Sequence, residues 1–270
     1  MKIKTRRYYI YYFAKIGVFL LGIIPLRMSL FIAECMGKIA YRVLKKYREI
    51  TVENLNNVFG KDSGFDVQKI AEKVFINLAK NGAEWIKFPG LNEKNISDLV
   101  KEFSGEEYLK EANSKGKGTI IMAFHFGNWE LLNLYLTIKG YGGIVIARRL
   151  YFHKYDKMIA RIRKRPGINL IYRDESPKKI LKHLKNGGIL GVLADQDVDS
   201  VEGIYVDFFG KSAYTPVAPV KLGLTQGASL LPCFVVRDTD NKFKVIVEKP
   251  IILNKTEDKE EDIKKYTASW

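Results

Sequence analysis

The chain has 270 residues and a formal net charge of +15, with 47% hydrophobic and 28% charged residues, which excludes a disordered or collagen-like protein. Two cysteines exclude a disulfide scaffold and a cysteine-rich zinc module, and three histidines leave few ways to build a histidine-rich metal site. A mean hydropathy of −0.13 excludes a polytopic membrane protein. The excess of cations favours an anionic partner: nucleic acid, anionic lipid or an acidic protein.

The N-terminus combines basic, aromatic and apolar residues. Residues 1–7 include four cations, and residues 8–26 are aromatic or apolar apart from the interruptions at Lys15 and Pro25. A spanning helix needs about 20 apolar residues, whereas clustered Tyr suits the headgroup level and Lys and Arg suit anionic lipid. We therefore expect residues 1–48 to form a helical segment that associates with the membrane. Spanning and surface binding both stay open, and a buried helical hairpin is the alternative.

Helical spacing of apolar residues continues to residue 114 and then gives way to short apolar runs bounded by glycines. The predicted helices cover residues 66–88, 95–103, 106–112, 129–139, 154–165, 176–187 and 217–226. The predicted strands cover residues 119–124, 142–147, 168–172, 189–194, 229–237 and 243–248. This alternation predicts an α/β fold, a mostly parallel or mixed sheet flanked by helices, in a domain over residues 49–270.

Two polar clusters follow predicted strands, and in open α/β sheets function collects at strand ends. The first is His-Phe-Gly-Asn-Trp-Glu at residues 125–130. Its spacing brings Glu130 within reach of one imidazole nitrogen of His125, which leaves the other nitrogen to take a proton from a substrate hydroxyl. A core histidine that happens to precede a helix is the alternative reading. The second cluster runs from Asp195 to Asp199.

The first cluster resembles the His-x4-Asp/Glu motif of the glycerolipid and lysophospholipid acyltransferases, and its Gly-Asn-Trp-Glu form is most similar to the bacterial lipid A late (secondary) acyltransferase branch. The resemblance extends over about residues 40–250. The further matching elements are Asn54-Leu55 with Phe59, Asp195-Gln196-Asp197, Phe208-Phe209-Gly210, Gly227-Ala228 and Pro232. The family implies a glycerolipid-acyltransferase-like α/β fold.

The resemblance also implies a reaction. A fatty acyl chain would move from an acyl carrier protein thioester to a hydroxyl of a lipid A precursor or related glycolipid, at the cytoplasmic face of the cell inner membrane. No cofactor is expected, because the thioester is a co-substrate. His125 would be the general base, Glu130 its partner, and Asp195 an acidic residue of the same site.

The resemblance further implies that an arginine four residues before a glycine, in the helix between the two clusters, belongs to this active site. Arg163 before Gly167 matches best, with Arg161 and Arg165 as close rivals. The tetrahedral intermediate needs donors for its oxyanion, and Arg163, the Asn128 side chain or a backbone N–H at the helix start are candidates.

Four residues are expected to bind substrate: Asn128, Arg148, Arg149 and Asp197. For the two arginines, a phosphate site and a solvated basic face are equally good interpretations. An acidic acyl carrier protein, an anionic glycolipid acceptor and the membrane surface all suit a chain of charge +15. No nucleic-acid motif is visible, and no metal is expected.

Two other function classes stay open at this point. The Asp195-x-Asp197 pattern also occurs in glycosyltransferases that hold a metal-bound nucleotide sugar, and a non-catalytic, basic membrane-surface protein would have the same charge and N-terminus. At the other end, residues 267–270 resemble the approach to an aromatic, basic element that the family usually continues into. We therefore expect the C-terminal end to be truncated.

Overall fold

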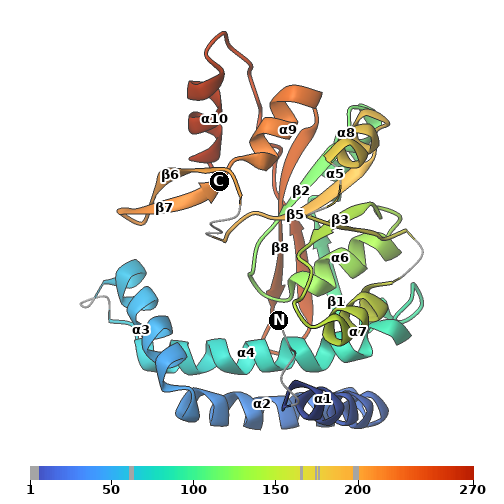
Figure 1. The fold of residues 1–270 in the computed structure, drawn as a ribbon, viewed down its shortest axis with the longest axis vertical. Helices are drawn as coiled ribbons and strands as arrows, with labels where there is room; N and C mark the ends of the chain where they lie inside the picture. The colour runs from blue at the N-terminus through green and yellow to red at the C-terminus, as the bar shows by residue number, and fades with distance from the viewer. Residues whose placement is uncertain (1–5, 61–63, 165–166, 174, 176, 197–200) are drawn as a thin grey trace. The chain divides into compact units, whose positions relative to one another are not determined.

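The computed structural model describes residues 6–60, 64–164, 167–173, 175, 177–196 and 201–270. The chain divides into two compact units, Met1–Gly90 and Leu91–Trp270; the first is helical and the second carries the sheet (Figure 1). The expected boundary after residue 48 lies within the first unit, where the helices before and after that residue pack on one another.

A stripe of small residues holds the helical unit together. Its helices are α1 (Arg6–Ile23), α2 (Leu26–Val43), α3 (Lys45–Phe59) and α4 (Val67–Lys87), followed by the short 3-10 helix η1 (Phe88–Gly90). Ser29, Ala33 and Gly37 recur every four residues on one face of α2 and are buried, and α2 packs on α4. A Cβ atom at Gly37 would lie 2.6 Å from the Cα of Ile76. Glycine therefore allows the two helix backbones to approach closely.

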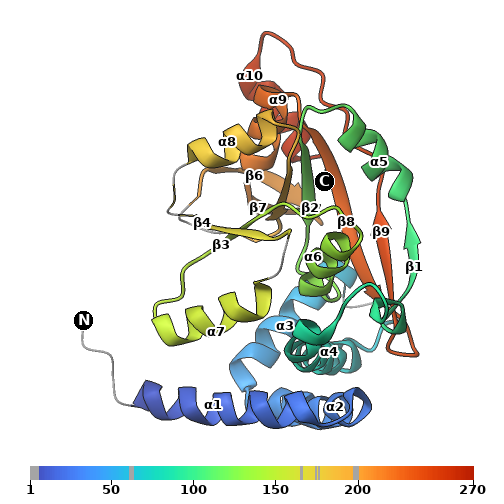
Figure 2. The same cartoon turned by 90° about the vertical axis from the view of Figure 1, so that its right-hand side faces the viewer.

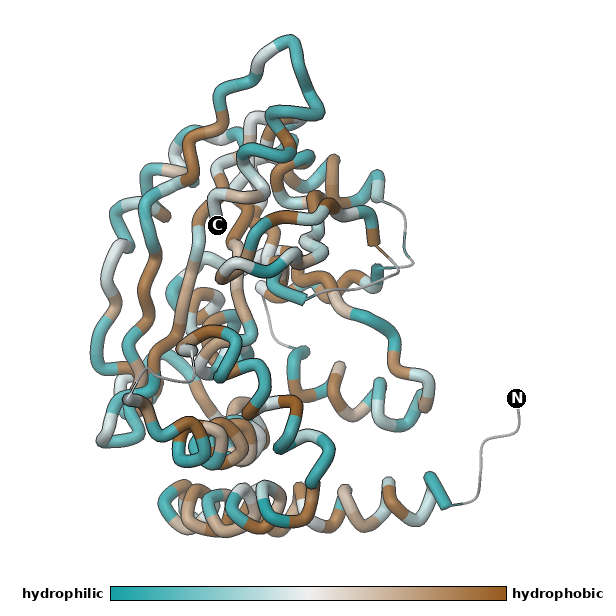
Figure 3. The backbone as a smooth tube through the Cα atoms, turned by 90° about the vertical axis from the view of Figure 1, so that its left-hand side faces the viewer, coloured by the Kyte–Doolittle hydropathy of each residue, from teal (hydrophilic) through white to brown (hydrophobic). Residues whose placement is uncertain are grey.

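Large apolar side chains remain exposed on α1 and on the outer face of α2. α1 buries none of its residues, and hydrophobic segments alternate with hydrophilic ones along it (Figure 3). The exposed large apolar residues of the two helices are Tyr9, Ile10, Tyr12, Phe13, Ile16, Phe19, Leu20, Ile23, Met28, Phe31, Ile32, Met36, Ile39 and Val43. Among the described residues, no helix has both the length and the hydropathy needed to cross a membrane.

The second unit alternates strands and helices along most of its length. Its elements are η2 (Ile96–Asp98), β1 (Val100–Ser104), α5 (Glu106–Ser114), β2 (Thr119–Ala123), α6 (Trp129–Ile138), β3 (Ile144–Ala147), α7 (His153–Arg163), β4 (Asn169–Tyr172), α8 (Pro177–Lys185), β5 (Ile189–Leu193), β6 (Gly203–Phe208), β7 (Lys211–Pro216), α9 (Ala218–Gln226), β8 (Ser229–Arg237), β9 (Phe243–Val247) and α10 (Lys259–Thr267). The six predicted strands are confirmed with ends shifted by at most two residues.

Seven strands form one sheet in the order β1-β9-β8-β2-β5-β3-β4 (Figure 2). Every neighbouring pair is parallel except β8 and β9. The predicted α/β fold with a mostly parallel or mixed sheet is therefore confirmed. β6 and β7 form a separate antiparallel hairpin.

Alternating side chains of the central strands serve opposite faces of the sheet. Ile120, Met122 and Leu190 are fully buried and belong to one core cluster with Leu184 of α8 and Val220 of α9. The residues between them on β2 and β5 face the site described below. The core therefore lies on the α8 and α9 side of these strands.

The predicted helix over residues 95–103 is wrong. The structure has only the short helix η2 there, followed by β1, in which Val100 and Phe103 pair with Phe243 and Val245 of β9. Apolar spacing in this segment matches a helix, but the backbone hydrogen bonds offered by the neighbouring strand outweigh that local preference.

Candidate active site

The register of β2 and β5 brings His125 and Asp195 together. The two strands are parallel neighbours, with Thr119 opposite Ile189 and Ala123 opposite Leu193. Residues that follow each strand by two positions are therefore adjacent as well. Nδ1 of His125 lies 2.8 Å from Oδ1 of Asp195, and the backbone N–H of His125 donates to Oδ2 over 2.6 Å.

This carboxylate fixes the imidazole. Burial alone would raise the pKa of Asp195, but the side-chain and backbone hydrogen bonds from His125 lower it, so Asp195 is ionised at neutral pH. An ionised carboxylate only accepts hydrogen bonds. Nδ1 of a neutral imidazole therefore carries the proton, and Nε2 keeps its lone pair. The His125 side chain is 26% exposed and lines a cavity.

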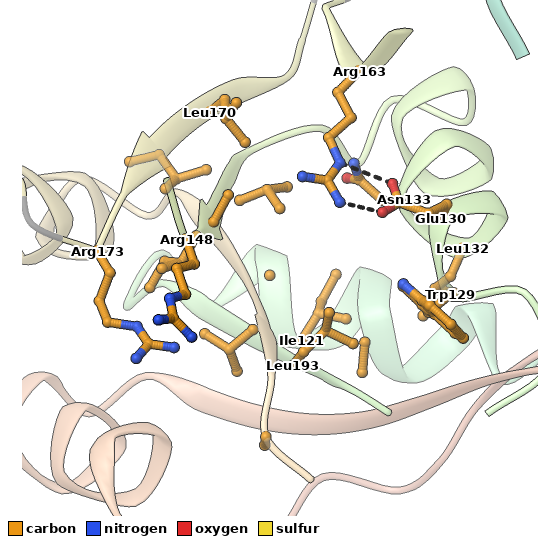
Figure 4. Close-up of a pocket in the computed structure, with 18 of the residues that line it drawn as sticks. Ile121, Trp129, Glu130, Leu132, Asn133, Arg148, Arg163, Leu170, Arg173 and Leu193 are labelled. Atoms are coloured by element: carbon orange, nitrogen blue, oxygen red, sulfur yellow. Dashed lines mark hydrogen bonds and ion pairs between the residues drawn. The ribbon is translucent and has the colours of Figure 1, made fainter. Parts of the chain in front are cut away.

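Glu130 has a different partner from the expected one. Nε of Arg163 donates to Oε2 of Glu130 over 3.0 Å, and Nη2 of Arg163 contacts Oε1, which makes a two-pronged ion pair (Figure 4). Burial alone would lower the pKa of Arg163, but the hydrogen bond and charge of Glu130 raise it. Instead of one His125–Glu130 pair, the structure has two acid–base pairs, because Asp195 already bonds Nδ1 and a guanidinium offers a carboxylate two parallel hydrogen bonds.

The turn between His125 and α6 depends on Gly127 and Asn128. Gly127 has φ +58, and a Cβ atom there would lie 1.6 Å from the carbonyl oxygen of Val235, so only glycine fits. The Asn128 side chain caps α6 by accepting a hydrogen bond from the Leu131 N–H over 3.2 Å, and the residue is 1% exposed. This buried position does not support the expected contact of Asn128 with a substrate.

His125, Glu130 and Arg163 border one cavity with a volume of about 430 Å³. Its walls come mainly from β2, β3, β4, β5, α6, α7 and α9 and are predominantly apolar, with Ile121 and Gly191 in the middle of the sheet. The lining continues to Gly143, Ile144, Ile189 and Leu136, which lie at the strand starts and the end of α6. The cavity therefore runs along the strands, from a polar end at His125 to an apolar end at the strand starts.

Arg148 and Arg149, both expected to bind substrate, have different surroundings in the structure. Arg148 follows β3 and lines the cavity. Arg149 instead lies over the Tyr172 ring, 3.9 Å from its centroid, and pairs with Glu175 at 3.4 Å. The fourth expected binding residue, Asp197, lies outside the described residues.

Arg173 is a lining residue that sequence analysis missed. Ala147 of β3 pairs with Tyr172 of β4, so the next residue of each strand, Arg148 and Arg173, come side by side (Figure 4). Its position directly after a predicted strand was the available signal. Of the three candidate arginines of the site, Arg163 faces the cavity, Arg161 is exposed, and Arg165 lies outside the described residues.

Known proteins resemble the chain over most of its length. The family model of the bacterial lipid A biosynthesis acyltransferases matches residues 1–269. A lipid A biosynthesis lauroyltransferase of Escherichia coli is 24% identical over 245 residues, 87% of this chain and 75% of that protein. A lipid A biosynthesis acyltransferase of Haemophilus influenzae is 24% identical over 227 residues, 81% and 70% of the two chains.

A phosphatidylinositol mannoside acyltransferase of Mycobacterium tuberculosis is 26% identical over 164 residues, 58% of this chain and 52% of the relative. The chain thus spans about half the length of that mycobacterial relative. The match of the family model to nearly the whole sequence places the chain in the bacterial lipid A biosynthesis acyltransferase family.

Proposed function

We propose that the chain transfers a fatty acyl group from an acyl carrier protein thioester to a hydroxyl of a lipid A precursor or related glycolipid. The observation that carries this proposal is the His125–Asp195 pair at the polar end of an apolar cavity. The cavity suits an acyl chain, because each buried methylene contributes about 0.8 kcal/mol. The pair suits the removal of a proton from a hydroxyl.

The chemical step needs no nucleophile from the protein. Nε2 of His125 takes the acceptor proton while the hydroxyl oxygen attacks the thioester carbonyl, and the tetrahedral intermediate then expels the thiolate, which recovers that proton. We assign the stabilisation of the oxyanion to Arg163, which lines the same cavity as His125, and to the N-terminal end of α6, which begins four residues after His125. Glu130 serves as a positioning residue that holds Arg163.

Arg148 and Arg173 form the anion-binding part of the proposed site. Two adjacent guanidinium groups suit a phosphate of an anionic glycolipid, since guanidinium matches phosphate geometry. Arg148→Ala and Arg173→Ala should each raise the KM for a phosphorylated acceptor. An equal rise with an acceptor that lacks phosphate would contradict this role.

The helical unit supplies membrane contact in this proposal. The exposed apolar residues of α1 and α2, together with neighbouring Lys and Arg, suit the headgroup boundary of an anionic bilayer. We infer a location at the cytoplasmic face of the cell inner membrane, where the acceptor lies.

The two alternative function classes lose their support. Both carboxylate oxygens of Asp195 bond His125, which makes this acid of the Asp-x-Asp pattern less available to a metal-bound nucleotide sugar; Asp197 lies outside the described residues. Membership of an acyltransferase family argues against a non-catalytic, basic membrane-surface protein.

Mass spectrometry of a lipid A precursor incubated with acyl carrier protein thioesters tests the proposal. The unsubstituted chain should add one acyl mass, and His125→Ala should reduce the rate about 10²–10⁴-fold, the usual contribution of a general base. His153→Ala, which changes a histidine on α7, is the matched control. An absence of any acylated product, or an equally active His125→Ala variant, would overturn the proposal.

A further inference from the structure

A second hollow lies at the edge strand β4, beside the cavity. It has a volume of about 730 Å³, and its lining includes Arg163, Lys164, Lys179, Lys182 and His183. We call these five residues and the space they border the basic groove. Glu175 also lines it, but Glu175 pairs with Lys179 at 3.3 Å and with Arg149 at 3.4 Å. Arg163 is likewise paired with Glu130. The excess positive charge of the groove therefore comes mainly from Lys164 and Lys182, for which the described residues provide no ion pair.

The outer face of α8 extends this charge. Lys178, Lys182 and Lys185 follow at intervals of four and three residues, so they share one helix face, and all three are exposed. Among the described side chains, none forms an ion pair with them. The opposite face carries Ile180, which packs against the core cluster, and Leu184, which is buried within it.

α8 differs from the helices that expose apolar residues. None of its large apolar side chains is exposed. The helix therefore presents lysine side chains to solvent but has no exposed apolar face that could insert into a lipid bilayer. A helix that inserts into a bilayer interface uses an apolar face beside its cations. A rigid, carboxylate-rich protein surface matches α8 better than a bilayer does.

The basic groove and the catalytic cavity adjoin at a shared wall. Five residues line both spaces: Ile144, Ala160, Arg163, Leu170 and Tyr172. The outer face of α8 lies on the other side of the sheet from α6 and α7, so a protein docked there reaches the cavity only round the edge strand β4, where the basic groove lies. In this proposal, the flexible arm that carries the thioester follows the groove round that edge toward His125.

We propose that the basic groove and the outer face of α8 form the docking site for the acidic carrier protein that delivers the acyl thioester. This inference rests on the proposed acyl transfer and adds the surface that the donor uses. Cation-rich docking predicts that the KM for the carrier thioester rises with ionic strength, because salt screens contacts between exposed charges.

The test compares two donors with one triple variant, Lys178→Glu/Lys182→Glu/Lys185→Glu. With the acyl carrier protein thioester, kcat/KM should fall about tenfold or more, mainly through KM. With an acyl-pantetheine thioester, which has no protein part, kcat/KM should stay unchanged. The matched control, Lys255→Glu/Lys259→Glu/Lys264→Glu, makes the same charge change at exposed positions on and before α10 and should leave both values unchanged.

Equal losses with both donors, or equal losses in the control variant, would overturn the docking site. Fluorescence anisotropy with labelled carrier protein that bears no acyl chain gives a second readout, and circular dichroism checks the fold. If the unsubstituted chain transfers from neither donor, the proposed function fails, yet loss of carrier binding in the α8 variant alone would still support the groove. Loss of binding to anionic vesicles with carrier binding intact would contradict it and indicate a lipid site instead.

Discussion

The helical unit and the sheet unit treat large apolar side chains in opposite ways. In the sheet unit, Ile120 and Leu190 are fully buried, whereas Phe13 and Phe31 of the helical unit are 74% and 70% exposed. Burial of apolar surface stabilises a fold by about 25 cal/mol per Å², so the exposed rings contribute little to folding. A chain keeps such surface when a second apolar phase covers it. An apolar run in a sequence thus specifies burial, but not the medium in which it is buried.

Paired truncations give the largest contrast between the units. Leu190→Ala should lower the free energy of unfolding by about 2–5 kcal/mol, because it opens a cavity in the core. Phe31→Ala should change it by no more than about 0.5 kcal/mol, the usual range for exposed positions. Urea denaturation measures both, and similar losses would mean that Phe31 is packed in the folded protein.

Vesicle binding tests whether the exposed aromatic residues of the helical unit, unlike those of the sheet unit, contact a membrane. Phe13→Glu/Phe31→Glu should weaken binding to anionic vesicles at least about tenfold, since each lost ring removes roughly 1.5–3 kcal/mol of burial. Tyr205→Glu changes an aromatic residue of the sheet unit that is also 70% exposed and serves as the control. Equal binding by all three proteins in a flotation assay would place the membrane contact elsewhere.

Donor chain length tests the cavity of the sheet unit. A Cβ atom at Gly191 would make ordinary contacts of 3.8 Å with Ile144 and Val145, so Gly191→Leu should be accommodated and should fill cavity space. Each displaced methylene costs about 0.8 kcal/mol, or roughly fourfold in kcat/KM. When donors of different acyl length compete, Gly191→Leu should shift the products toward shorter chains, and Gly191→Ala should cause a smaller shift. An unchanged ratio of short-chain to long-chain product would show that this cavity does not bind the acyl chain.

The pH dependence of stability gives the smallest expected effect. The folded-state pKa of Asp195 is lowered, so its carboxylate stabilises the fold above the unfolded value of about 4, and this contribution disappears as the pH falls through the folded-state pKa. The stability difference between the unsubstituted chain and Asp195→Asn should therefore shrink as the pH drops from about 5 to 3. Glu257→Gln controls for the loss of one charge, and a difference that stays constant would contradict the pairing.

Local sequence signals located six of the seven strands of the main sheet and the two strand ends that carry His125 and Asp195. Glycine-bounded apolar runs and helical spacing predicted six strands, because these patterns reflect burial on one or two faces. The strand β1 was missed because its identity depends on β9, about 140 residues away. Such pairing leaves no mark in the local pattern.

The dependence on distant strands also explains why the side-chain pairs of the site differ from the expected His125–Glu130 pair. His125 and Asp195 were each recognised at a strand end, but their pairing depends on β2 and β5 being neighbours in register. Sequence proximity favoured Glu130, whose carboxylate instead meets Arg163 from the next helix. Arg173 joined Arg148 for an equivalent reason, since β3 and β4 are adjacent.

The most direct test of the central claim, that Asp195 holds His125 as the base, is a double-mutant cycle on kcat. His125→Ala, Asp195→Asn and the double variant are compared by mass spectrometry of acylated product. Residues that act as one unit are strongly non-additive, so the double variant should be no slower than the slower single variant. Losses that multiply would contradict the claim and show that the two residues act independently.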